Sequence, residues 1–284
     1  MKLFRFGEKG SERPGAFDRN GIRRDISGAL GDLTGADLSP MCLARLSELD
    51  MDAFPEVRDD VRIGACVGHV GNFIAIGLNY ADHAAESGMP APEEPIVFNK
   101  AASCVSGPND DILIPPGSTK TDWEVELAVV IGAHASYVSE DDASQVIAGY
   151  CICNDVSERA YQLERGGQWT KGKGCPTFGP LGPWLVTPDE IEDVQDLPMW
   201  LTVNGKRMQT GSTKTMIFGV NFLVSYVSQF MALEPGDVIT TGTPPGVGLG
   251  MKPPQYLCDG DNIELGIAGL GVQRQNVRAA LART

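Results

Sequence analysis

Short runs of alternating or uniformly hydrophobic residues recur along the chain and predict β-strands. They cover residues 2–6, 73–77, 96–100, 146–153 and 262–267. A hairpin is predicted over residues 199–209, because they contain Asn204-Gly205, the strongest dipeptide signal for a two-residue turn. Helical spacing is confined to short segments such as residues 40–48 and 222–231. The pattern therefore predicts a strand-rich α+β fold.

One predicted strand, residues 122–131, carries acidic side chains. Alternation places Glu124 and Glu126 on one face of this strand, whereas hydrophobic residues occupy the other face. Two carboxylates this close repel each other unless a cation lies between them. The pair is therefore a candidate for half of a metal site, although the same pattern is more often the solvent-facing side of an antiparallel sheet.

Asp155 is the candidate for a third oxygen ligand. It follows the hydrophobic run of residues 146–153 and is followed by the polar residues Ser157, Glu158 and Arg159. Three carboxylates suit a hard divalent cation and leave coordination positions open for water and substrate. The sequence therefore predicts a Mg²⁺ or Mn²⁺ site.

His83 and Glu86 form a candidate acid–base pair. The spacing becomes helical in residues 78–86, and side chains three residues apart lie on the same face of a helix. A glutamate that accepts the imidazole proton would orient the ring and increase its basicity. The alternative is an ordinary surface ion pair. The Pro-rich residues 88–95 indicate a connector that would make the His83 segment a lid.

Further segments could bind an acidic ligand. Arg159 and Gln162 are three residues apart in a helical segment, so both could face one ligand. The glycine-rich residues 166–174 include Lys171 and Lys173, but they lack the spacing of a nucleotide-binding loop. The turn Thr-Gly-Thr-Pro-Pro-Gly, residues 241–246, can donate hydrogen bonds to a carboxylate. Lys100 ends a predicted strand, and the sequence favours neither a structural nor a functional role for it.

Composition narrows the class of partner. The 284 residues include 23 Lys and Arg against 37 Asp and Glu, a formal net charge of −14, and no basic run. We therefore expect a small-molecule partner and no nucleic acid. No hydrophobic run reaches the roughly 20 residues of a membrane span, and no signal peptide is recognisable, so a cytoplasmic protein is expected. The seven scattered cysteines are expected to be free thiols in the core.

Five segments, in chain order, resemble the motifs of the fumarylacetoacetate hydrolase family. They are residues 77–83, 122–126, 154–159, 169–173 and 240–248, and the resemblance extends over about residues 69–272. It implies a mixed β-roll catalytic domain in residues 69–284, preceded by a small N-terminal domain in residues 1–68. It also implies a homodimer and a Mg²⁺ or Mn²⁺ site.

The resemblance implies roles for the acidic and basic candidates. Glu124, Glu126 and Asp155 match the three metal ligands of the family, and His83 with Glu86 matches the pair that activates water.

The remaining matches concern the substrate. Lys173, rather than Lys171, matches the lysine placed against the substrate. Thr243 matches the threonine expected at the substrate carboxylate, and Arg159 and Gln162 lie where family members shape the pocket. Gly174 departs from the family pattern, in which serine is common, so a hydroxyl contact is not expected there.

The implied reaction is hydrolysis of a carbon–carbon bond in a 2,4-dioxo acid. A divalent ion would polarise the 2-oxo group, and His83, oriented by Glu86, would deprotonate the attacking water. Within the family, the chain is most similar to bacterial hydrolases that split a sugar-derived dioxo acid into pyruvate and L-lactate. Acylpyruvate hydrolase, oxaloacetate decarboxylase and ureidoglycolate lyase-like activities remain open, because they use the same ligands. A non-catalytic binding module is the alternative from another class.

Overall fold

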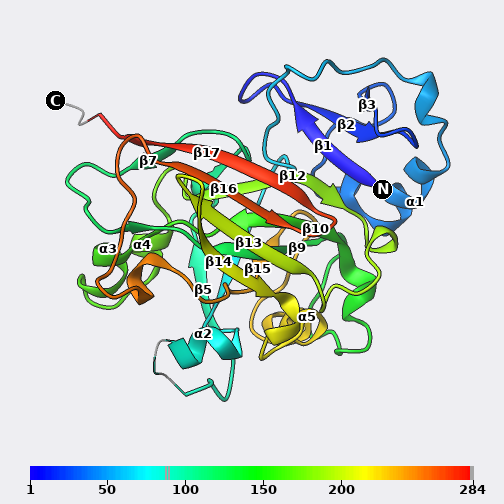
Figure 1. The fold of residues 1–284 in the computed structure, drawn as a ribbon. Coiled ribbons are helices and arrows are strands. Elements are labelled where there is room, and N and C mark those ends of the chain that lie inside the picture. Colours follow the sequence, from blue (N-terminus) through cyan, green and yellow to red (C-terminus); the bar gives the residue numbers. More distant parts are fainter. Residues whose placement is uncertain (87, 89, 282–284) are drawn as a thin grey trace.

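The computed structural model describes residues 1–86, 88 and 90–281. Within these residues the strands form one sheet of ten strands, one of five and one of two. The helices are short: α1 (Pro40–Ser47), α2 (Ala81–Glu86), α3 (Arg159–Leu163), α4 (Thr170–Lys173) and α5 (Val220–Ser228). The structure therefore confirms the predicted strand-rich α+β fold (Figure 1).

The largest sheet forms the centre of the molecule. In spatial order its strands are β3 (Arg23–Asp25), β2 (Arg13–Phe17), β1 (Lys2–Phe6), β12 (Gly179–Val186), β10 (Ile147–Asn154), β9 (Val125–Ile131), β15 (Val238–Thr240), β4 (Phe73–Gly77) and β5 (Ile96–Lys100), and β6 (Val105–Ser106) also pairs with β12. The β15–β4 and β12–β6 pairs are parallel, and the other neighbours are antiparallel. The sheet is therefore mixed.

The five-stranded sheet contains the predicted hairpin. In spatial order its strands are β14 (Lys206–Ser212), β13 (Pro198–Val203), β16 (Asn262–Ile267), β17 (Gly271–Ala279) and β7 (Ile112–Ile114). The turn residues Asn204 and Gly205 have φ values of 51° and 74°, as a type I′ turn requires. A short ladder pairs β8 (Thr121–Asp122) with β11 (Ser157–Glu158) and joins the two segments that carry the acidic motifs.

Strand β9 is buried on both faces, which differs from the half-exposed strand that alternation suggests. All seven of its residues are buried. Strands β10 and β15 pair with its two edges, and β13 and β16 pack against it. Glu124 is 5% exposed and Glu126 only 2% exposed. The solvent-facing interpretation of these two carboxylates is therefore wrong.

The N-terminal strands extend the same large sheet. Strand β1 pairs antiparallel with β12, with Lys2 opposite Val186 and Leu3 opposite Leu185. In Figure 1 the strands β1, β2 and β3, in blue, lie at the upper right, whereas α2 lies at the bottom of the view. The division between residues 1–68 and 69–284 stays a prediction.

Cysteine positions and helix lengths bear on two other expectations. All seven cysteines are free, but Cys258 is exposed, and Cys42 and Cys175 are half-buried, so the expectation of core thiols is wrong for these three. In the part of the chain that the structure describes, no helix has both the length and the hydrophobicity needed to cross a bilayer.

Candidate active site

One cavity of about 670 Å³ is lined by all nine residues to which the sequence analysis assigns a catalytic, metal-binding or substrate-binding role. These residues come from α2, the start of β9, the segment after β10, α3, α4 and the turn after β15. They are His83, Glu86, Glu124, Glu126, Asp155, Arg159, Gln162, Lys173 and Thr243. The fold therefore gathers segments that are far apart in the sequence around one space.

The pairing of β9 with β10 places the three carboxylates together. Glu126 lies opposite Cys153 in this ladder, and the Asp155 amide donates to the Glu124 carbonyl over 2.9 Å. One carboxylate oxygen from each of Glu124, Glu126 and Asp155 lies within 4.8 Å of the other two. Such a buried group of oxygen ligands has the chemistry that a hard divalent cation requires.

Cationic side chains hold two of these carboxylates. The Lys173 ammonium donates to Glu124 Oε2 over 2.5 Å and to Asp155 Oδ2 over 2.7 Å. An Arg159 guanidinium nitrogen donates to Glu124 Oε1 over 2.6 Å. Burial alone would raise the pKa of Glu124, but the charges of Arg159 and Lys173 outweigh it and lower that pKa to about 2. Glu124 is therefore ionised at neutral pH.

Glu126 forms no ion pair with a cationic side chain among the described residues. Its Oε2 accepts from the Thr240 hydroxyl over 2.5 Å and from the Gly242 amide over 2.9 Å, whereas Oε1 accepts no hydrogen bond from this part of the chain. Burial, together with the charges of Asp155 and Glu124, raises the pKa of Glu126 well above its usual value. A divalent cation beside Glu126 would relieve this repulsion, so the three carboxylates fit a metal ion.

His83 and Glu86 lie on α2 as the spacing predicts. His83 Nδ1 is 3.2 Å from Glu86 Oε2, and the side chains are 12% and 28% exposed. The Gly246 amide donates to both Glu86 oxygens at 3.2 Å. These hydrogen bonds connect α2 to the loop after β15. Met89, which belongs to the predicted connector, lies outside the described residues, as does Ser87.

The predicted substrate-binding side chains are buried and already paired. Arg159 also donates to Asp122 Oδ2 over 2.8 Å and to Gln162 Oε1 over 3.0 Å. The Thr243 hydroxyl donates to the Val125 carbonyl over 2.9 Å. Donation from Thr243 to a substrate carboxylate would therefore require this backbone hydrogen bond to break.

Two residues of the site were not assigned a role by sequence reasoning. Lys100, which is 3% exposed, donates to Asp155 Oδ1 over 2.5 Å and to the Lys173 carbonyl over 2.6 Å. Asp122, which is fully buried, binds Arg159. The available signals were a lysine that ends a hydrophobic strand and an aspartate two residues before Glu124.

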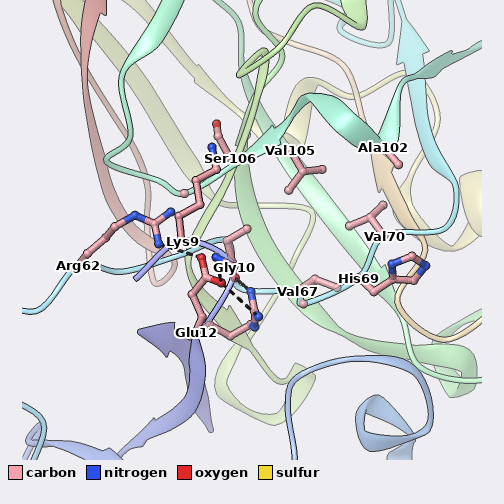
Figure 2. Close-up of a pocket in the computed structure, with 14 residues that line it drawn as sticks. Lys9, Gly10, Glu12, Arg62, Val67, His69, Val70, Ala102, Val105 and Ser106 are labelled. Carbon is pink, nitrogen blue, oxygen red and sulfur yellow. Dashed lines mark hydrogen bonds and ion pairs between the residues drawn. The ribbon is translucent and has the colours of Figure 1, made fainter. Parts of the chain in front are cut away.

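A second cavity, of about 510 Å³, lies between the N-terminal strands and the segments around β6 (Figure 2). Its arginines form ion pairs: Arg62 donates to Glu12 over 2.8 Å and to Asp110 over 2.7 Å. Arg5 donates to Asp32 over 2.6 Å. None of the metal-binding, catalytic or substrate-binding candidates lines this cavity, so we do not regard it as the active site.

Comparison with known proteins identifies the family to which the chain belongs. The structure superposes on fumarylacetoacetate hydrolase from Exiguobacterium antarcticum with a TM-score of 0.88 and 38% identity, over 99% of this chain and 100% of that one. Residues 72–278 match the family described as fumarylacetoacetate hydrolase, C-terminal. The chain belongs to the fumarylacetoacetate hydrolase family and is an enzyme of that family.

Relatives within the family differ in their named activities. The chain is 60% identical, over 99% of its length and 100% of the relative, to a Burkholderia multivorans protein named no more closely than as a hydrolase. Maleylpyruvate hydrolase from Sphingobium, solved with manganese(II) and pyruvate, is 27% identical with a TM-score of 0.81, over 99% of this chain and 100% of that one. A 5-carboxymethyl-2-hydroxymuconate delta-isomerase from Mycobacterium smegmatis is 32% identical with a TM-score of 0.78, over the same shares of the two chains.

Proposed function

We propose that the protein hydrolyses a carbon–carbon bond in a 2,4-dioxo acid with the help of Mg²⁺ or Mn²⁺. The observation that carries this proposal is the buried group of Glu124, Glu126 and Asp155 in a cavity that also contains the His83–Glu86 pair. The maleylpyruvate hydrolase structure, which contains manganese(II) and pyruvate, supports the same reaction class.

The roles of the chain's own residues follow from their positions. His83, held by Glu86, accepts a proton from water, and the hydroxide adds to C4 of the substrate. The C3–C4 bond then breaks, C4 becomes the carboxyl carbon of one product, and the electron pair leaves on the enolate of pyruvate, which takes up a proton at C3. The Lys173 ammonium stabilises the negative charge that develops on the substrate oxygens, and Arg159 orients the acid. A divalent ion bound by the three carboxylates would supply a Lewis acid for the 2-oxo group.

The electrostatic balance of the site suits an anionic substrate. The buried carboxylates of Asp122, Glu124, Glu126 and Asp155 face three buried cations, Lys100, Arg159 and Lys173. A bound divalent ion would turn this slight negative excess into a positive one. The site could then attract an organic acid in spite of the chain's formal charge of −14.

The substrate that we propose is 2,4-didehydro-3-deoxy-L-rhamnonate, which would give pyruvate and L-lactate. Its carbon chain ends in a methyl group. The cavity wall includes the hydrophobic side chains Phe98, Leu163, Trp169, Leu249 and Met251. Such a wall favours a methyl terminus over a hydroxymethyl terminus.

The test is pyruvate release from a panel of 2,4-dioxo acids and oxaloacetate, with and without Mg²⁺ or Mn²⁺. Metal-dependent pyruvate together with L-lactate from the deoxy-sugar acid is expected. Pyruvate from acylpyruvates without lactate would indicate an acylpyruvate hydrolase, and pyruvate from oxaloacetate alone would indicate a decarboxylase. Glyoxylate and urea from added ureidoglycolate would indicate the lyase. No product from any of these compounds would contradict the proposed function.

Isomerisation is a second candidate, because structures named as isomerases superpose over the whole chain. An isomerase moves a proton from one atom of the substrate to another and releases no pyruvate. It therefore needs no attacking water. An absorbance change from an unsaturated hydroxy acid, without pyruvate, would favour this candidate.

A further inference from the structure

The loop of residues 246–250 is held by carboxylates from two sides. Its sequence is Gly-Val-Gly-Leu-Gly, and it contributes Val247, Leu249 and Gly250 to the wall of the active-site cavity. On one side its Gly246 amide donates to Glu86 of α2. On the other side Asp122 binds the amides of Gly248 and Leu249 over 2.7 and 3.0 Å. The loop therefore lies between α2 and the segment that precedes the metal-site strand.

Asp122 uses both of its oxygens fully. Oδ1 accepts from the amides of Trp123 (2.8 Å) and Gly248 (2.7 Å). Oδ2 accepts from Arg159 Nε (2.8 Å) and from the Leu249 amide (3.0 Å). The side chain is fully buried, so water cannot replace any of these donors.

The neighbouring residue supports the same loop. Trp123 Nε1 donates to the Gly246 carbonyl over 3.1 Å, next to the amide that Glu86 binds. The close approach depends on glycine, because a Cβ at Gly248 would lie 2.8 Å from Asp122 Oδ1 and 1.9 Å from the Gln255 carbonyl oxygen. Asp122 and Trp123 thus form a rigid support for the loop, immediately before Glu124 in the chain.

We propose that Asp122 is a positioning residue that couples Arg159 to the His83–Glu86 pair through this loop. The Asp122 carboxylate binds the Arg159 guanidinium on the cavity wall and also the amides of Gly248 and Leu249. These amides belong to the loop whose Gly246 amide binds Glu86. The expected effect of this coupling on kinetics rests on the proposed function. The coupling itself can be measured without any substrate.

The test is Asp122→Asn. An amide has one oxygen and one nitrogen, so in either orientation two of the four N–H donors, one of them from the loop, face an NH₂ group that cannot accept. Hydrogen exchange, followed by mass spectrometry, is expected to become at least about tenfold faster in residues 246–251 and in 81–86. Unchanged exchange in residues 81–86 would overturn the proposal.

Kinetics provide a second readout. When the loop is loose, substrate binding must also close it, so KM is expected to rise by about tenfold while kcat stays within about threefold. A lower kcat at unchanged KM would indicate a mere loss of folded enzyme and would overturn the coupling. If the unmodified protein itself releases no pyruvate, the proposed function fails, but the exchange data still decide the coupling.

Asp110→Asn is the matched control. Asp110 also accepts two hydrogen bonds from one arginine, Arg62, and one from a backbone amide, that of Gly107. It lines neither the active-site cavity nor the loop. We expect a loss of stability without a change in KM or in exchange at residues 81–86.

A second variant covers the case in which Asp122→Asn does not fold. A Cβ at Gly250 would lie 3.2 Å from Glu86 Oε2, so Gly250→Val should displace the Glu86 carboxylate and leave Asp122 in place. Faster exchange in residues 81–86 and a higher KM are expected. Unchanged values of both would overturn the role of the loop.

Discussion

The ammonium group of Lys100 lies 2.5 Å from Asp155 Oδ1, and both side chains are almost completely buried. The same ammonium donates to the main-chain carbonyl of Lys173 over 2.6 Å. Lys100 therefore fixes one proposed metal ligand relative to the backbone of Lys173, the lysine that we propose faces the substrate.

Lys100→Met should leave the Asp155 carboxylate without this buried donor. We expect the free energy of unfolding to fall by about 3 kcal/mol, because one partner of a buried ion pair is lost. Mn²⁺ affinity should fall by about tenfold or more, because Asp155 loses its orientation. Chemical denaturation and calorimetric titration would measure the two effects. Lys120→Met is the control: its ion pair with Glu164 is exposed, so a change within about 0.5 kcal/mol is expected.

His83→Ala should lower turnover of a dioxo acid by about 10²-fold or more, because the attacking water loses its base. Mn²⁺ affinity should not change, since the imidazole is outside the carboxylate group. Decarboxylation of oxaloacetate needs no water and should be less affected. His134→Ala is a control, because this ring is 61% exposed and pairs with Glu234 on the surface. Full turnover by the His83 variant would refute its role as a base.

The stabilisation of the folded protein by Mn²⁺ should depend on pH, because the Glu126 carboxyl must be ionised to bind the ion. Because the folded pKa of this carboxyl is raised, its protonation stabilises the metal-free protein at low pH, and that contribution is lost as the pH rises through the raised pKa. Mn²⁺ needs the ionised carboxylate. Saturating Mn²⁺ should therefore raise the melting temperature more at pH 8 than at pH 5. Glu126→Gln should greatly reduce this difference, and equal shifts in the unmodified protein would contradict the prediction.

Lys173→Met should separate metal binding from turnover. Its ammonium bridges two proposed ligands, Glu124 and Asp155, so its removal leaves their facing oxygens free for a cation. Lys100 differs, because it contacts Asp155 alone, through the other carboxylate oxygen. We expect tighter Mn²⁺ binding but about 10²-fold lower kcat, because the developing charge on the substrate loses its partner. Lys171→Met is the control, since the Lys171 ammonium donates to the Arg165 carbonyl near the surface. Weaker Mn²⁺ binding by Lys173→Met would contradict this account.

Local patterns in the sequence were sufficient to predict several strands and one turn of the fold. Strands β1, β5 and β16 have the predicted bounds, and the turn at Asn204-Gly205 has the predicted geometry. No strand was predicted at β17, because its buried positions include the polar residues Gln273 and Gln275. Their side-chain amides donate to the carbonyls of neighbouring segments, which satisfies them inside the protein. Such tertiary partners leave no periodic hydrophobic signal in the sequence.

Strand β12 was missed for a related reason. It contains Pro180 and Pro183 in the middle of the large sheet, where proline is usually avoided because it cannot donate to the ladder. The site shows the same limit of local reasoning. His83 and Glu86 are visible as one helical turn, whereas the contacts of Lys100 with Asp155 and of Asp122 with the 246–250 loop join distant segments.

The pairing of β1 with β12 has a consequence for solubility. The family match begins at residue 72. Strand β12, which lies inside the matched region, is paired with β1, which lies outside it at residues 2–6. A chain shortened to the matched region would expose the backbone donors and acceptors along that side of β12. Open sheet edges of this kind pair readily with other chains, so we expect the shortened chain to aggregate more readily than the full one.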